Sequence, residues 1–173
     1  MSAPLDDLAD REMALLAHVR AARGLMEDVE RTLREDGTFA AYAAVHADYV
    51  ALADGPEPDL EALKRALFLS WYQITEPSCF TGVDDLDAHA VARSYAALDR
   101  VVGEGRVDDE LAAMLGWYEG VHCGWHGCAA PTERALLDSL PADAYKNLGF
   151  SREDLERRGQ MGDYWISIAC RPV

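Results

Sequence analysis

The stretch DLEALKRALFLSWYQITEPSCFTGV, residues 59–83, decides the fold of this chain. Its first apolar residues recur at steps of three and four, as on one face of a helix, and from Leu67 onward they occupy every side. A helix that is apolar all round is buried by other helices. Glu61, Lys64 and Arg65 lie in the first half, and the pattern predicts that these three side chains point to water.

The ends of this helix are also marked in the sequence. Asp59 follows the breaker Gly-Pro-Glu-Pro and is a suitable N-cap. Pro77 disfavours the α conformation at Glu76, so the helix should end near Thr75. The sequence therefore predicts a buried central helix over about residues 60–75.

The rest of the chain shows helical spacing and turn residues, with no hairpin signal and no internal repeat. Apolar residues follow steps of three and four from Pro4 to Asp36, in one helix or in two that break at Gly24, because glycine lowers helix propensity. Asp84 or Asp85 is expected to cap a later helix. The prediction is an all-α, single-domain bundle over residues 1–173, with six to seven helices around the central one.

Charge limits the classes of partner. The 173 residues include 16 Lys and Arg against 31 Asp and Glu, a formal charge of −15. Such a field repels phosphate backbones and anionic lipids, so we expect neither nucleic acid nor a membrane surface as partner. No stretch approaches the roughly 18 apolar residues that span a bilayer. The first residues show no secretory signal and the four cysteines no disulfide framework, which predicts a cytoplasmic protein.

Metal-ligand residue types gather in the segment DDELAAMLGWYEGVHCGWHGC, residues 108–128. Glu119, His122 and His126 stand at i, i+3 and i+7, at the edge of the apolar face. Two histidines four apart on a helix can bind one metal ion, and a carboxylate one turn before them is a fitting third ligand. The structural alternative is a pair of polar edge residues that bond a carboxylate or a backbone carbonyl.

An earlier histidine, His46, extends this candidate set. His46 with His122 and His126 is similar to the three-histidine arrangement of DinB-like metal-binding bundles. The resemblance covers these three residues, and it implies a helical bundle that holds a divalent transition metal. No cofactor is assigned from the residues alone.

Glu76 marks a second candidate site. It follows the most apolar part of the chain, beside Trp71 and Tyr72. A carboxylate there could anchor a small ligand in a pocket beneath the central helix. The alternative is a carboxylate that accepts backbone N–H bonds from the next turn, with both aromatic residues in the core.

Three glycines at four-residue intervals suggest a surface for close approach. Gly116, Gly120 and Gly124 lie on the side of their helix opposite the apolar stripe. Each glycine inside a helix costs about 1 kcal/mol relative to alanine, so three of them indicate a broken helix or a face that another backbone approaches. Close packing within the domain, a second subunit and a ligand all fit this pattern.

The functional hypothesis follows from these features and from missing motifs. The chain has no phosphate-binding loop, dinucleotide fingerprint or nucleophile elbow. The leading hypothesis is a non-enzymatic helical protein that binds another protein, with a homodimer as one form of that binding. The alternatives are a metal-binding bundle, with or without enzymatic activity, and a protein with a small-ligand pocket near Glu76.

Overall fold

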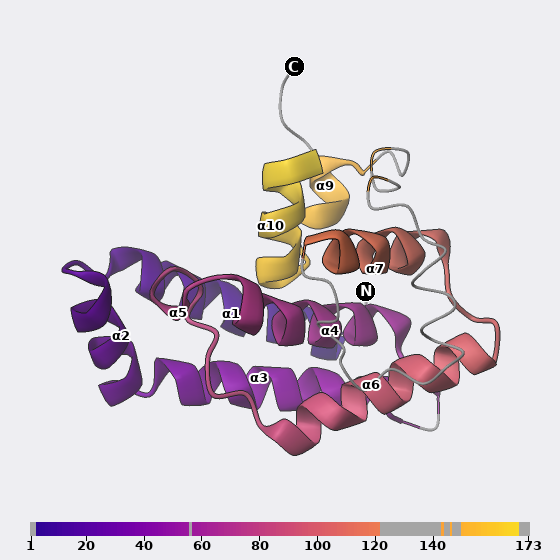
Figure 1. The fold of residues 1–173 in the computed structure, drawn as a ribbon, viewed down its shortest axis with the longest axis horizontal. Helices are drawn as coiled ribbons and strands as arrows, with labels where there is room; N and C mark the ends of the chain where they lie inside the picture. The colour runs from indigo at the N-terminus through magenta and orange to yellow at the C-terminus, as the bar shows by residue number, and fades with distance from the viewer. Residues whose placement is uncertain (1–2, 56, 122–142, 144–145, 147–149, 170–173) are drawn as a thin grey trace.

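The computed structural model describes residues 3–55, 57–121, 143, 146 and 150–169 of the chain. These residues form helices and no strands, packed together as an all-α bundle (Figure 1). The helices are α1 (Ala3–Ala21), α2 (Met26–Glu35), α3 (Thr38–Ala53), α4 (Leu60–Thr75), α5 (Ser78–Thr81), α6 (Ala88–Gly103), α7 (Asp109–Val121), α9 (Arg152–Leu155) and α10 (Gly159–Ala169). The predicted fold class is confirmed. Two of these helices, α5 and α9, have only four residues each, too few to show a periodic pattern in the sequence.

Helix α4 is the central helix, as predicted. It packs against α3, α6, α7 and α10, and its residues from Ala62 to Trp71 are all buried. The Asp59 carboxylate caps it by accepting the Ala62 N–H, and the helix ends at Thr75 before Pro77. Burial on every side explains why the second half of this sequence has so few polar residues.

The predicted exposure of Lys64 and Arg65 is wrong. Only 4% of Lys64 and 1% of Arg65 are exposed, although both are charged. Buried cations need carboxylate partners: those of Lys64 are Asp108 and Glu110, distant in the sequence, whereas Arg65 pairs with Glu61 one turn earlier on α4. Helical periodicity on one element does not reveal the partners of Lys64.

The long N-terminal segment forms two helices that separate at Gly24, one of the two predicted alternatives. Gly24 has φ +140°, a backbone conformation that side-chain-bearing residues rarely adopt. Helix α1 packs against α3 and α10. Helix α2 lies at one end of the molecule and packs against α3 and α5 (Figure 1). The direction of the chain at the corner between α1 and α2 therefore depends on the backbone conformation of Gly24.

The connection from α4 to α6 contains the short helix α5. Gly82 ends it with φ +72°, and a Cβ there would lie 2.6 Å from atoms of both Tyr42 and Val19. This glycine lets α5 press against α1 and α3. The next helix, α6, is capped by Asp87, not by Asp84 or Asp85 as predicted. Both of those aspartates instead pair with Arg34 of α2.

The C-terminal part of the described chain completes the core. Ser151 caps α9 by accepting the Asp154 N–H, and α10 follows with Trp165 buried. A Cβ at Gly162 would lie 1.9 Å from the Leu155 carbonyl oxygen, so this glycine is required for the close turn between α9 and α10. Among the described helices, none has both the length and the apolar character to cross a membrane.

Candidate functional site

The predicted metal ligands are not brought together within the described part of the chain. His46 lies in α3 and Glu119 in α7, and α4 packs against both helices from opposite sides (Figure 1). His122 and His126 lie outside the described residues. No group of three His, Cys, Asp or Glu residues with metal-binding geometry occurs among the residues that are described. The metal site stays a prediction.

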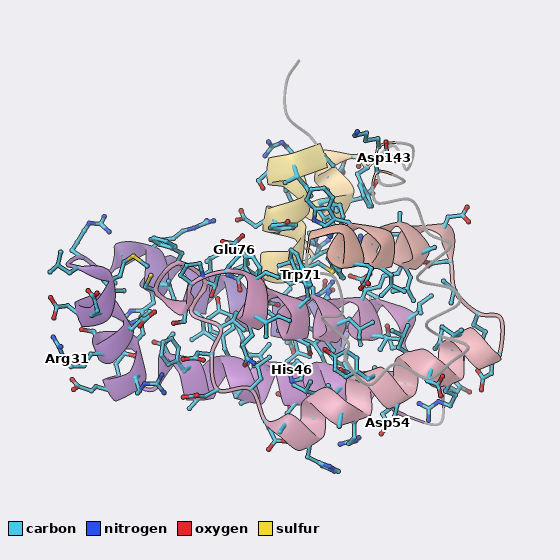
Figure 2. The ribbon with its side chains drawn as sticks, viewed as in Figure 1. Arg31, His46, Asp54, Trp71, Glu76 and Asp143 are labelled. Carbon is cyan, nitrogen blue, oxygen red and sulfur yellow. The ribbon has the colours of Figure 1, made fainter. Side chains whose placement is uncertain are left out.

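His46 has a structural environment. Its imidazole is fully buried, and Nε2 lies 3.0 Å from Ser70 Oγ on α4 (labelled in Figure 2). Burial lowers the pKa of His46 to about 4, because the charged imidazolium would lose its hydration. Its Nδ1 has no hydrogen-bond partner among the described residues. At neutral pH this histidine is an uncharged member of the core.

The candidate ligand residues divide between core and surface. Trp71 is fully buried, and its ring stacks on Tyr118 with centroids 4.6 Å apart and an interplanar angle of 22°. Tyr72 is half-buried and packs on Phe68 at 4.7 Å. Glu76 is exposed beyond the end of α4 (Figure 2). The two aromatic residues thus belong to the packed interior, and a pocket anchored by Glu76 stays a prediction.

The candidate glycine face is described only in part. Both Gly116 and Gly120 lie within the regular helix α7, so α7 is not broken at either glycine. Gly116 is buried and Gly120 is exposed, while Gly124 lies outside the described residues. Gly116 thus lies inside the bundle, and both close packing at this face and an intermolecular contact at Gly120 stay predictions.

Sequence reasoning missed a buried charge network around α4. Arg158, which precedes α10, donates from Nε to Glu61 Oε1 at 2.8 Å and also pairs with Glu110 of α7. Arg65 Nε donates to the same Glu61 oxygen at 2.8 Å, and Lys64 Nζ lies 2.5 Å from Glu110 Oε2. The Glu61–Arg65 spacing of i, i+4 was visible in the sequence, but the partners from α7 and α10 were not. The network joins α4 and α7 to the residue that precedes α10.

Glu12 is a second buried charge-bearing residue that the sequence did not single out. It fills a gap in the apolar spacing of α1, and its side chain is 1% exposed. Tyr49 donates to Oε2 at 2.8 Å, and the Gln160 N–H at the start of α10 donates to Oε1 at 2.9 Å. Burial raises the pKa of Glu12 to about 7, although these two hydrogen bonds and the charge of Arg65 act in the opposite direction. The carboxyl group holds helices together inside the core.

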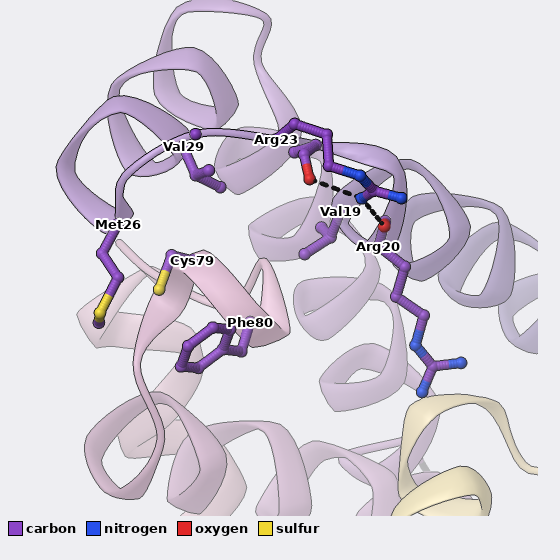
Figure 3. Close-up of a pocket in the computed structure, with 9 residues that line it drawn as sticks. Val19, Arg20, Arg23, Met26, Val29, Cys79 and Phe80 are labelled. Atoms are coloured by element: carbon purple, nitrogen blue, oxygen red, sulfur yellow. Dashed lines mark hydrogen bonds between the residues drawn. The ribbon is translucent and has the colours of Figure 1, made fainter.

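An apolar groove lies where the corner between α1 and α2 meets α5. It has a volume of about 250 Å³ and is shown in Figure 3. We call this feature the corner groove, and its lining residues are Val19, Arg20, Ala22, Arg23, Gly24, Met26, Val29, Cys79 and Phe80. The residues come from three elements, and the positive φ of Gly24 and Gly82 sets the turns that bring them together.

Exposed apolar side chains concentrate at the corner groove. Four large hydrophobic side chains are exposed in the described part of the chain: Leu25 (72%), Met26 (47%), Ile74 (46%) and Phe80 (63%). Met26 and Phe80 line the groove, and Leu25 stands between two of its lining residues in the sequence. Single exposed apolar residues are ordinary on protein surfaces, but a cluster beside a hollow is typical of a binding site.

The corner groove also contains a cysteine. Cys79 is buried, and burial raises the pKa of its thiol, with the negative charge of Glu30 acting in the same direction. The thiolate is the nucleophilic form of cysteine, so a thiol that stays protonated is a poor nucleophile. The protonated Cys79 side chain therefore forms an apolar part of the groove lining.

Comparison of the chain with protein-family models, with curated proteins and with solved structures gives no match.

Proposed function

We propose that this protein is a binding module that holds a segment of another protein in the corner groove. The observation that carries the proposal is that Met26 and Phe80, two of the four large hydrophobic side chains exposed in the described part of the chain, line this hollow. A third, Leu25, directly precedes Met26 in the sequence. Exposed apolar surface of this kind is stabilised when a partner covers it. Met26 adds an adaptable thioether, which is common on surfaces that bind peptides.

The chemistry of the lining supports binding over catalysis. Val19, Val29, Met26 and Phe80 provide apolar contact. The one nucleophile in the groove lining, Cys79, has a raised pKa. Binding sites for apolar side chains need shape and desolvation, which these residues offer.

Overall charge favours a partner other than a second copy. Each chain carries a formal charge of −15, so two copies repel each other at long range. A homodimer through the same groove is the alternative, and sedimentation analysis distinguishes the two. A cytoplasmic location is part of the proposal, supported by cysteine spacing that fits no disulfide framework.

The test is selection of a displayed library of random twelve-residue peptides on the immobilised full chain. We expect a defined family of peptides to be enriched on the wild-type protein. The Phe80→Asp variant places a charge in the groove and should weaken binding of these peptides at least about tenfold, as loss of a central apolar contact does. The control is Ile74→Asp, which changes an exposed apolar residue that does not line the groove.

Circular dichroism establishes that both variants are folded. Equal binding to wild type and Phe80→Asp would contradict the proposal, as would the absence of any enriched peptide. A concentration-dependent dimer that Phe80→Asp dissociates would identify the partner as a second copy.

A further inference from the structure

One arginine that lines the corner groove, Arg23, is held in place by hydrogen bonds to the end of the preceding helix, α1. Arg23 follows the end of α1, and its Nη1 donates to the carbonyl oxygens of Arg20 at 2.7 Å and Ala22 at 2.8 Å. Arg20 lies in the last turn of α1 and Ala22 directly follows its end, where the helix dipole favours positive charge. The guanidinium group lies over Val19 at the edge of the groove (Figure 3). Its position is thus set before any partner arrives.

Arg23 has no carboxylate partner in the described part of the chain. Neighbouring Arg20 lines the groove too, but its side chain extends to α10, where Nη2 lies 2.6 Å from Asp163. Arg23 makes only the two carbonyl bonds that Figure 3 draws within the described residues. In a chain with 31 acidic and 16 basic side chains, an arginine without an acidic partner is unexpected.

The geometry of Arg23 leaves its carboxylate-binding edge available. A guanidinium group has five N–H donors, and both carbonyl bonds use Nη1. The Nε and Nη2 donors point along the other edge of the plane. Two parallel donors of this kind match the two oxygens of a carboxylate, which arginine prefers to bind in a bidentate manner.

Two glutamates of α2, Glu30 and Glu27, act on the Cys79 side of the groove, although neither lines it. Ser78 of α5 donates to Glu30 Oε1 at 3.0 Å, and the charges of Glu30 and Glu27 both raise the pKa of the adjacent Cys79. A carboxylate on a bound segment is therefore repelled from the Cys79 side and attracted to Arg23. The charge distribution fixes both the sign of the partner's charge and the end of the groove at which it lies.

We propose that the occupant of the corner groove is a peptide segment of another protein that inserts one apolar side chain and binds Arg23 through an adjacent Asp or Glu. The inference rests on the proposed function and adds the chemistry of the partner. A cavity of about 150 Å³ admits a benzene ring, so a groove of about 250 Å³ has room for one large apolar side chain. The apolar contact provides affinity, and the arginine selects segments with an acid beside that contact.

The experiment compares the peptides selected on wild type with those selected on Arg23→Gln. Glutamine keeps an N–H donor for the helix carbonyls but has no charge and no bidentate edge. We expect an acidic residue at a fixed distance from a large apolar residue in the wild-type peptides, and the same apolar residue without acidic preference on Arg23→Gln. A synthetic peptide of the enriched sequence should bind wild type about tenfold more tightly than its Asp→Asn or Glu→Gln counterpart, and the two should bind Arg23→Gln equally.

The matched control is Arg31→Gln, which removes an exposed arginine of α2 that does not line the groove. This variant should keep the tenfold preference. Decanoate, a free acid with an apolar tail, is titrated in parallel to separate a protein segment from a small amphiphile with the same chemistry.

The outcomes separate the two proposals. Peptides that depend on Phe80 but show no acidic preference would overturn the role of Arg23 and leave the binding function intact. An acidic preference that persists in Arg23→Gln would also overturn this inference. Saturable binding of decanoate at the groove without any enriched peptide would replace the protein segment by a small acid. Absence of any ligand that depends on Phe80 would remove both proposals.

Discussion

The ionisation of Glu12 couples the stability of the described core to pH. Its carboxyl group is buried, and two hydrogen bonds hold it between Tyr49 and the first turn of α10. In the unfolded chain it would have the ordinary glutamate pKa of 4.5, whereas in the folded protein the pKa is raised to about 7. Between these values the folded protein keeps a proton that the unfolded chain has released. The contribution of the Glu12 carboxyl group to the free energy of unfolding is therefore fully present below pH 4.5 and is lost as the pH rises through 7.

The variant Glu12→Gln tests this linkage. We expect the free energy of unfolding of wild type, relative to that of the variant, to fall by about 3 kcal/mol between pH 4 and pH 8, because a glutamine does not titrate. Urea unfolding at a series of pH values measures the difference. Parallel profiles for the two proteins would show that the carboxyl group titrates alike in both states.

Buried His46 makes this comparison of two proteins necessary. Burial lowers its pKa from 6.5 to about 4, so its contribution to stability is present above pH 6.5 and is lost as the pH falls through 4. The effects of His46 and Glu12 oppose each other in the wild-type profile. The difference between wild type and Glu12→Gln cancels the histidine contribution and isolates that of the glutamate.

At the scale of elements, the charge network determines how α10 joins the bundle. Arg158 is buried immediately before α10 and pairs with Glu61 of α4 and Glu110 of α7. Its removal would take one of two cations from each carboxylate, since Glu61 keeps Arg65 and Glu110 keeps Lys64. An unpaired buried charge is costly, whereas replacement of a whole network by apolar residues is often neutral.

We expect Arg158→Met to destabilise the protein by about 3 kcal/mol, near the lower end of the range for buried pairs, because both carboxylates keep some contact with water. Thermal unfolding followed by circular dichroism measures the change. Arg152→Met is the control, since Arg152 and Glu156 form an exposed pair 3.8 Å apart that should contribute less than about 1 kcal/mol. Equal effects of the two substitutions would show that the network adds no more than a surface pair.

At the scale of the whole molecule, α10 shares one core with the N-terminal helices. Trp165 of α10 is buried among aromatic residues that include Tyr118 of α7 and Phe150. Glu12 of α1 and Asp163 of α10 also make bonds between the two helices. The single domain over residues 1–173 stays a prediction.

A single domain should unfold in one cooperative transition. We expect the urea transitions measured by far-ultraviolet circular dichroism and by tryptophan fluorescence to coincide, because Trp71 and Trp165 lie in the same core as the helices that the dichroism reports. A fluorescence transition at lower urea than the helical one would show that the region around α10 unfolds separately.

The all-α class, the central helix and both of its ends were predictable from the sequence. These depend on local information: apolar residues around the whole helix, a capping aspartate and a proline that excludes the α conformation at Glu76. The alternative break at Gly24 was likewise visible, because the low helix propensity of glycine is a property of one residue.

The burial of the charged residues and the position of the corner groove depend on how the helices pack together, which the sequence does not reveal. Lys64 and Glu12 belong to residue types that usually lie at the surface, and they are buried because partners from distant elements satisfy them. Met26 and Phe80 are 54 residues apart in the sequence, and they line one groove because α2 and α5 pack together. Periodicity reports how one element is solvated on average, whereas ion pairs and grooves depend on which elements meet.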